Sequence, residues 1–490
     1  MYLSKSQYIR GLQCHKALWL YRHRRELMSA ADANREAMFA TGHRVGELAK
    51  SRFPGGSEIE FDGDNFSGMI EQTTRLIEAG EGVIYEATFL CDGVLVMADI
   101  LCRNGAVWDF YEVKSSTRVK PYHLNDAAVQ WHVLHSCIPL GKAHVMHINN
   151  RYHFARRLDI EQLFTIADVT DTVQELQPEV VANLASMQTM LEGAEPEIPI
   201  GNQCKNPFEC DFRDYCWRQV PVPSVFDLHK LSGERKFELF HRGLVSYRDL
   251  RQEPLNATQS LQLQTALSGQ PHLDHERLAL FIDSARYPIY FLDFETLQDA
   301  IPRFEGQRPY QQIPFQYSLH ILQRDGRLEH REYLADEHAD PRAALAARLV
   351  GDIGASGSIV AHSQATEIAA INGLATACGP LAGQLRAMVN RFIDLLTPLR
   401  GLMYYHPDFN GDFSIKSVLP AMFPQDADAD YKALEVQDGR MAMSIYAGLN
   451  AIEDAAERER SRTALLAYCR LDTLAMVKVW RELARQAGSG

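Results

Sequence analysis

The stretch VIYEATFLCDGVLVMADILCRNGAVWDFYEVKS, residues 83–115, predicts three β-strands joined by two tight turns. Its apolar runs are rich in Val, Ile, Phe and Tyr, and they are interrupted by Asp92-Gly93 and by Asn104-Gly105. Asp-Gly and Asn-Gly dipeptides between apolar runs are the strongest short-range signal for a β-hairpin. This stretch therefore predicts a β-sheet in the N-terminal part of the chain.

Helices and further strands are predicted on both sides of this sheet. A fourth strand is expected at 143–155 and helices at 158–192, after which the prolines of VPVPSVFD indicate a boundary. A polar helical segment follows, and a second strand–helix alternation begins at YPIYFLDFET, residues 287–296. The sequence thus predicts an α/β fold in three parts: a domain at 1–220, a helical connector at 221–285 and a second domain at 286–490.

Composition limits the class of protein. The 490 residues are 46% hydrophobic and 23% charged, which is ordinary for a globular protein. The sequence contains no apolar run of about 18 residues, and its start lacks the apolar core of a signal peptide. We therefore expect a cytoplasmic protein with no membrane partner. The net charge of −13 argues against a surface coated with positive charge, but it leaves room for a local basic groove and for acidic metal sites.

The first candidate site lies on the predicted strands. Asp99 interrupts the apolar run VLVMADIL, and Glu112 and Lys114 are two residues apart, so they leave one face of a strand. A buried carboxylate needs a partner, and two of them on neighbouring strands can hold Mg²⁺ or Mn²⁺. Glu86 and Gln130 can reach the same area, and Lys114 could stabilise charge at a phosphate. The alternative is an ordinary salt bridge in a half-buried sheet.

The second candidate site combines a strand with the last long helix. Asp293 and Glu295 share one face of a strand, and Tyr468 and Asp472 are four residues apart on one helical face. Glu367 lies on a helix between them. Acids brought together in this way can bind two divalent cations about 4 Å apart, and Tyr468 could orient an attacking water. A solvated strand end is the alternative for Asp293 and Glu295.

Three evenly spaced cysteines, Cys204, Cys210 and Cys216, lie in QCKNPFECDFRDYC, residues 203–216. Zinc sites and iron–sulfur clusters usually take four protein ligands, so a fourth would have to come from elsewhere. The alternative is three unrelated thiols. In a reducing compartment disulfides are not expected. Five other cysteines are interpreted as core thiols: Cys91, Cys102, Cys137, Cys378 and Cys469.

Residues 1–220 resemble the PD-(D/E)XK nuclease superfamily, specifically its RecB/AddB-like and CRISPR-associated four-cysteine branch. Asp99, Glu112, Lys114 and Gln130 fall on the motif positions, with Glu86 as a further acid for metal. The resemblance implies a restriction-endonuclease-like mixed sheet covered by helices.

The same branch implies a partner for the three cysteines. In it, a cysteine near the N-terminus joins three that follow the nuclease core, and Cys14 in RGLQCHKALW occupies that place. The resemblance therefore implies a [4Fe–4S] cluster on Cys14, Cys204, Cys210 and Cys216. Zinc at the same four cysteines is the second choice.

Residues 286–490 resemble the RNase H-like DEDD exonucleases, in the Tyr variant found in the DnaQ-like group. The resemblance implies an RNase H-like sheet with helices and metal held by Asp293, Glu295, Glu367 and Asp472. Glu367 stands where most relatives have Asp. Lys416, in FSIKSVLPAMF, is a candidate for phosphate contact.

The order of these parts is similar to that of a bacterial fusion family known mostly by this architecture. It implies an enzyme, a divalent-metal-dependent nuclease that hydrolyses phosphodiester bonds, with DNA favoured over RNA and single strands or ends preferred. DNA repair or defence against foreign DNA would be its setting. One alternative is one active and one degenerate centre. Another is a non-catalytic iron–sulfur protein that binds or senses nucleic acid.

Overall fold

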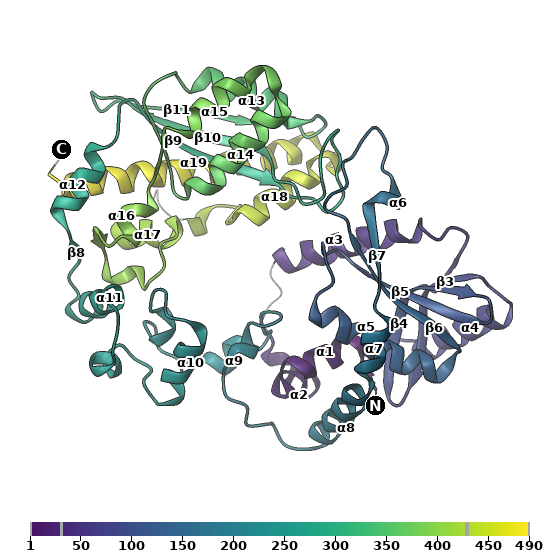
Figure 1. Ribbon diagram of the computed structural model, residues 1–490. Helices are drawn as coiled ribbons and strands as arrows, with labels where there is room; N and C mark the ends of the chain where they lie inside the picture. The colour runs from purple at the N-terminus through teal and green to yellow at the C-terminus, as the bar shows by residue number, and fades with distance from the viewer. Residues whose placement is uncertain (1, 30–32, 427–430, 489–490) are drawn as a thin grey trace. The chain divides into compact units, whose positions relative to one another are not determined.

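The computed structural model describes residues 2–29, 33–426 and 431–488 (Figure 1). It is a mixed α/β structure, as expected. The chain separates into two compact units: unit 1 is Met1–Gln219 with Asp299–Tyr310, and unit 2 is Val220–Gln298 with Gln311–Gly490. The whole of the expected helical connector, 221–285, which does contain helices, thus belongs to unit 2.

Unit 1 is built on one mixed sheet with the strand order β2-β3-β4-β5-β6-β7, and β1 pairs with β4. Strands β3, β4 and β5 are antiparallel, which confirms the two expected hairpins, and β6 runs parallel to β5 after the crossover helix α5. The strands are β1 (Leu3–Ser4), β2 (Ser57–Glu58), β3 (Val83–Cys91), β4 (Val94–Asn104), β5 (Val107–Lys114), β6 (Leu140–Ile148) and β7 (Phe164–Asp168).

The expectation of helices over 158–192 is wrong at Phe164–Asp168. Strand β7 lies there and pairs antiparallel with β6, from His144 opposite Asp168 to Ile148 opposite Phe164. The short sequence FTIAD contains β-branched residues, and pairing with an existing strand overrides the helical pattern of its neighbours.

Helices cover both faces of the unit-1 sheet. One apolar core includes Leu18 of α2, Phe110 and Trp131, and the other joins Val45 of α3 to Ile100 and Met146. The helices are α1 (Lys5–Gln13), α2 (His15–His23), α3 (Ala33–Lys50), α4 (Phe66–Glu78), α5 (Pro121–Cys137), α6 (Ile160–Leu163), α7 (Thr170–Glu175), α8 (Gln177–Glu192) and α9 (Arg213–Trp217).

The segment Asp299–Tyr310 completes the second core of unit 1 although it follows unit-2 residues in the chain. Ala300 is buried in that core. The backbone N–H of Phe154 donates to the carbonyl of Gln307 at 2.9 Å, and the Tyr310 hydroxyl donates to the carbonyl of Ser115. This segment is therefore fixed to unit 1 by both packing and hydrogen bonds.

Unit 2 has a five-stranded sheet in the order β11-β10-β9-β12-β13. Strands β9, β10 and β11 form an antiparallel meander, and β12 and β13 run parallel to β9. A separate pair joins β8 to β14. The strands are β8 (His272–Leu273), β9 (Ile289–Leu297), β10 (Ile313–Leu322), β11 (Leu328–Leu334), β12 (Ser358–Ala361), β13 (Phe392–Asp394) and β14 (Tyr404–Tyr405).

Helices α13, α14 and α15 pack on one face of this sheet, and the long helix α19 crosses β9 and β10 (Figure 1). Helices α10 and α11 contribute to a small core of their own, which includes Leu239 and Leu263. The helices are α10 (Gly233–His241), α11 (Ala257–Ser268), α12 (His275–Asp283), α13 (Pro341–Asp352), α14 (Gln364–Ala377), α15 (Ala382–Val389), α16 (Leu396–Arg400), α17 (Ile415–Met422), α18 (Gly439–Gly448) and α19 (Ala455–Gln486).

No helix in the described part of the chain is long and apolar enough to cross a membrane.

Candidate metal centres

Three carboxylates lie in one row across the unit-1 sheet. On β3, Tyr85 and Ala87 on either side of Glu86 pair with Ile100 and Ala98 on either side of Asp99. Ile100 pairs in turn with Tyr111, the residue before Glu112. Glu86 adopts a positive φ of 56°, which is uncommon for a residue with a side chain. Like charges directly opposite one another destabilise a sheet, and strained backbone is concentrated at functional sites. These three carboxylates therefore need positive charge beside them, from basic side chains or from a metal ion.

Two lysines and an amide satisfy the most buried of these acids. Lys5 and Lys114 each donate to Glu112 Oε1 at 2.7 Å, and Gln130 Nε2 donates to Glu112 Oε2 at 2.7 Å. Lys114 also pairs with Asp126. Burial opposes ionisation of Glu112, but Lys114 and Lys5 hold the pKa of its carboxyl well below the usual range. Glu112 is thus an ionised, fully partnered acid.

Asp99 is in a different electrostatic state. Its Oδ2 accepts the backbone N–H of Val113 at 2.7 Å, but burial, and then the neighbouring Glu112, raise the pKa of Asp99 to about 7. Burial likewise raises the pKa of Glu86 and of Asp126. Four carboxyl groups and two ammonium groups leave two negative charges when all are ionised, which is the charge that one divalent cation would neutralise.

We call these seven residues the unit-1 centre. All five residues expected here from the sequence do meet, and the structure adds Lys5 and Asp126. Asp126 lies four residues before Gln130 on α5, so helical spacing could have indicated it. Lys5 lies more than 100 residues away from Glu112 in the chain, and no local pattern points to it. The members are Lys5, Glu86, Asp99, Glu112, Lys114, Asp126 and Gln130.

Replacing Lys5 by methionine is expected to weaken the metal-free protein and to strengthen its binding of Mn²⁺. Glu112 loses a charge-assisted hydrogen bond, which costs about 1.5–3 kcal/mol. The centre also loses a cation that repels metal, so the Mn²⁺ affinity should rise about tenfold. Thermal unfolding in EDTA and in a Mn²⁺ titration measures both effects.

The matched control for this change is Lys142→Met, because the Lys142 side chain is 57% exposed and pairs only at the surface with Asp168. It should change neither quantity. A fall in Mn²⁺ affinity in the Lys5→Met variant would mean that Lys5 supports the metal rather than competing with it.

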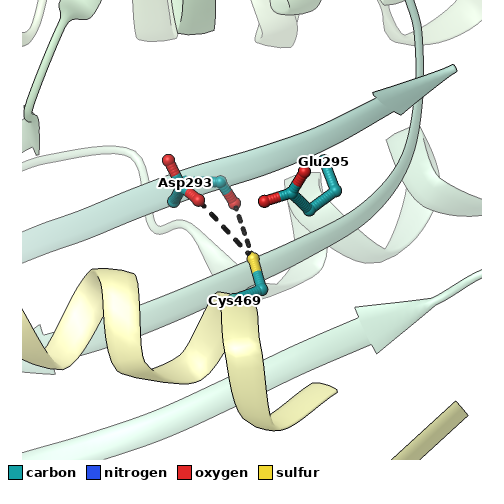
Figure 2. Close-up of side chains that lie close together, drawn as sticks. All are labelled: Asp293, Glu295 and Cys469. Carbon is teal, nitrogen blue, oxygen red and sulfur yellow. Dashed lines mark hydrogen bonds between the residues drawn. The ribbon is translucent and has the colours of Figure 1, made fainter. Parts of the chain in front are cut away.

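Unit 2 holds a second group of potential ligands. Oxygen atoms of Asp293 and Glu295 and the sulfur of Cys469 all lie within 4.8 Å of one another (Figure 2). The two acids come from β9, and the thiol comes from α19, which packs across that strand. The Cys469 thiol lies 3.7 Å from both the carbonyl oxygen and Oδ2 of Asp293.

Two further acids surround this group. Glu367, from α14, is only 5% exposed, and its Oε2 has no hydrogen-bond partner. Burial, then Asp293 and Glu295, raise the pKa of Glu367 well above the usual range. Asp472 accepts a hydrogen bond of 2.7 Å from the Tyr431 hydroxyl, but burial raises its pKa to about 6. Ionising these buried acids is therefore unfavourable, and a bound cation would make it favourable.

Tyr468 and Lys416 supply the other polar groups. Lys416 Nζ lies 3.1 Å from the Tyr468 hydroxyl and 2.6 Å from the carbonyl of Gln437. Burial, together with Asp472 and Glu295, raises the pKa of Tyr468 far above the usual range. Tyr468 is therefore a neutral phenol that can orient a water molecule but cannot remove its proton at neutral pH.

We call this set the unit-2 centre: Asp293, Glu295, Glu367, Lys416, Tyr468, Cys469 and Asp472. The four acids and the tyrosine expected from the sequence influence one another's ionisation directly. Cys469 was expected to be only a core thiol. It is buried as expected, but its sulfur also faces the acids. Its position three residues before Asp472 on one helix could have indicated this.

The four expected cysteines of unit 1 line one cavity: Cys14, Cys204, Cys210 and Cys216. Cys14 ends α1 and begins α2. Gln13 Nε2, beside it, donates at 2.7 Å to the carbonyls of Gln203 and Phe208, which ties the N-terminal helix to the cysteine loop. Burial raises the pKa of the Cys210 thiol to about 11, and the other three thiols add to the effect.

The spacing of these sulfurs bears on what they could hold. Thiolates around a single zinc ion, at about 2.3 Å from it, are about 3.8 Å apart. Within the described residues, no three of the four sulfurs lie within 4.8 Å of one another. The four thiols are therefore not placed in this structure as three or more ligands of one zinc ion would be.

If the four cysteines hold the iron–sulfur cluster that the resemblance implies, replacing Cys204 by serine is expected to remove its iron and to destabilise unit 1. A cross-link between Cys14 and Cys204 closes a very long loop, and closing a loop of this size stabilises a fold by about 4–5 kcal/mol in the chain-entropy model. Iron, sulfide and zinc content together with thermal unfolding measure the loss. Cys137→Ser, at an exposed thiol of the same unit, should change none of them.

The comparisons with known proteins match only part of the chain. A family model described as a domain of unknown function (DUF2779) matches residues 290–414, a range that includes Asp293, Glu295 and Glu367 but ends before Tyr468. No curated protein and no solved structure matches the chain.

Proposed function

We propose that this protein is a divalent-metal-dependent nuclease that hydrolyses phosphodiester bonds in DNA, preferring single strands or ends. One observation carries the proposal: each unit gathers four largely buried carboxyl groups with lysine beside them. In unit 1 they come from the consecutive elements β3, β4, β5 and α5, and in unit 2 from β9, α14 and α19, which are far apart in the chain. Buried acids in such numbers are costly unless they hold a cation. The two mixed sheets covered by helices are compatible with the nuclease folds that the sequence resembles.

In unit 1, Glu86, Asp99 and Glu112 would hold the metal, which would lower the pKa of a bound water and neutralise the phosphate. Lys114 can move from Glu112 to the phosphate, where its ammonium would stabilise negative charge as water attacks phosphorus and the bond to the leaving oxygen breaks. Gln130 keeps Glu112 oriented by its hydrogen bond to Oε2.

In unit 2, Asp293, Glu295, Glu367 and Asp472 would hold metal. Tyr468 would orient the attacking water by a hydrogen bond, and Lys416, next to its hydroxyl, would contact a phosphate oxygen. The four cysteines would hold a [4Fe–4S] cluster with a structural role, because they connect α1 and α2 to the end of unit 1.

A specific observation favours the alternative of one active and one degenerate centre. Glu112 in unit 1 is already neutralised by two lysines of the chain, whereas Glu367 in unit 2 has an oxygen without a partner. If only one centre works, the unit-2 centre is favoured, because its four acids have one lysine beside them and keep the larger uncompensated negative charge.

The test is cleavage of DNA strands labelled at the 5′ or the 3′ end, with Mn²⁺, by wild type, Lys114→Met and Asp293→Asn. A working centre should slow by about 100- to 1,000-fold when its residue is replaced. Loss in one variant identifies the active unit, and partial loss in both, with different products, indicates two nucleases.

Lys142→Met in unit 1 and Asp325→Asn in unit 2 are matched surface controls, since both side chains are more than half exposed. Wild-type protein that cleaves neither DNA nor RNA would refute the enzymatic proposal and leave the non-catalytic binding protein.

A further inference from the structure

Cys469 is the feature of the unit-2 centre that an all-oxygen magnesium site does not require. Its side chain is completely buried, and its sulfur faces the carboxyl groups of Asp293 and Glu295 (Figure 2). The thiol is 3.7 Å from Asp293 Oδ2. Three potential ligand atoms from a strand and a crossing helix thus converge on one point.

A second observation also points to a cation at this place. Glu367 is nine-tenths buried or more, its Oε2 has no partner, and the charges that act on it most strongly are those of Asp293 and Glu295. An unpartnered buried carboxylate beside two others is expensive. A cation held by Asp293, Glu295 and Cys469 would also place positive charge near Glu367, and so lower the cost of ionising all three acids.

We propose that Asp293, Glu295 and Cys469 form one metal-binding position that takes a transition-metal cation of the Zn²⁺, Co²⁺, Fe²⁺ or Mn²⁺ class in preference to Mg²⁺. The inference rests on the proposed function and specifies its metal. Magnesium prefers oxygen ligands, whereas a thiolate ligand favours softer cations. Binding would form a metal–sulfur bond and release the thiol proton to solvent.

The other reading of the geometry is a protonated core thiol that donates weak hydrogen bonds to Asp293. The two readings differ in spectroscopy, because only a metal-bound thiolate gives a sulfur-to-cobalt charge-transfer band. The first experiment therefore titrates Co²⁺ into full-length protein, wild type and Cys469→Ala. We expect a band in wild type that is absent from the variant.

Controls separate this band from signals of the four unit-1 cysteines. Asp293→Asn should remove the same band, whereas Cys378→Ala, at another buried thiol of unit 2, should keep it. The four-cysteine site is intact in all of these variants, so the difference spectra report only the unit-2 centre.

The second experiment measures metal preference by thermal shift. Cys469→Ala should weaken Zn²⁺ and Co²⁺ binding by at least about tenfold while changing Mg²⁺ binding much less. If the alanine variant unfolds without metal, Cys469→Ser provides the same comparison with a side chain of similar size.

The possible results separate a failure of the sulfur ligand from a failure of the proposed metal-dependent function. The cobalt band and the metal preference could be unchanged in Cys469→Ala but lost in Asp293→Asn. That result would show that Cys469 is not a ligand, while the metal centre itself would remain supported. If no cation changes the spectrum or the melting temperature of either wild type or Asp293→Asn, both the inference and the proposed metal dependence are refuted.

Discussion

Asp99→Asn is expected to stabilise the metal-free protein, and Glu112→Gln is expected to destabilise it, although both should abolish metal binding in unit 1. The pKa of Asp99 is about 7 instead of 3.8, so its charge costs about 4 kcal/mol at alkaline pH, at 1.36 kcal/mol per pKa unit. Asparagine removes that charge and can still accept the N–H of Val113. Glutamine at 112 instead leaves two buried ammonium groups with fewer partners, at a cost of about 3–5 kcal/mol.

The pH dependence follows from the direction of the Asp99 shift. The folded protein keeps the Asp99 proton up to about pH 7, whereas the unfolded chain releases it near pH 4. The unfolded state therefore binds fewer protons between these values, and stability falls as pH rises. The advantage of Asp99→Asn should be absent near pH 4, grow up to about pH 7 and then level off.

Thermal unfolding in EDTA at pH 5 and pH 8 measures these differences. At about 2–4 °C per kcal/mol for a unit of this size, Asp99→Asn should gain roughly 5–15 °C at pH 8, and Glu112→Gln should lose a similar amount. Glu71→Gln, on the exposed surface of α4, serves as the neutral control. Shifts of the same sign in the two variants would contradict this electrostatic account.

Metal-free unit 2 is expected to lose stability from pH 5 to pH 8, and Mn²⁺ is expected to restore it. Burial raises the pKa of Asp472 to about 6, which makes its charge cost about 3 kcal/mol above that pH. Burial also raises the pKa values of Asp293, Glu295 and Glu367 well above their ordinary values, so their ionisation adds to the loss as pH rises. The combined fall should reach about 10 °C.

Mn²⁺ requires the ionised acids, so its stabilising effect should be larger at pH 8 than at pH 5. At a free concentration of 100 times Kd it amounts to about 2.7 kcal/mol. Asp293→Asn should flatten the metal-free pH profile and abolish the Mn²⁺ effect. Asp325→Asn should alter neither, because Arg327 holds the pKa of that exposed carboxyl below its ordinary value, outside the tested range. A wild-type profile that rises with pH would exclude strained acids in this unit.

Local sequence patterns were sufficient to predict the strands and the site residues that interrupt the pattern of a single strand or helix. The Asp-Gly and Asn-Gly turns predicted β3, β4 and β5, and an acid in an apolar run indicated Asp99 and Asp293. Lys5 could not be found this way, because a lysine near the N-terminus has no signal for a partner on a strand far along the chain. Cys469 was hidden for another reason, since a buried thiol looks like core whichever group it faces.

The fold differs from the predicted one where strand pairing or packing depends on residues that are distant in the sequence. Strand β7 forms because it can pair with the free edge of β6. The sequence FTIAD does not differ strongly in its β-propensity from the helical segments around it. Segment Asp299–Tyr310, rich in polar and aromatic residues, reads as a loop of the second domain. Its assignment to unit 1 depends on contacts with Phe154 and Ser115, which no local pattern encodes.

The place of Asp299–Tyr310 in unit 1 sets the order of events during synthesis. The chain leaves unit 1 at residue 219, yet the last piece of its core emerges only with residue 310. About 90 further residues take roughly 5–20 s to translate. During that interval all four cysteines have been made, but the apolar surface that Ala300 covers is still open. A fragment ending at 219 would remain in that state permanently. Unit 1 can finish folding only after β9, the first strand of the unit-2 sheet, has been made.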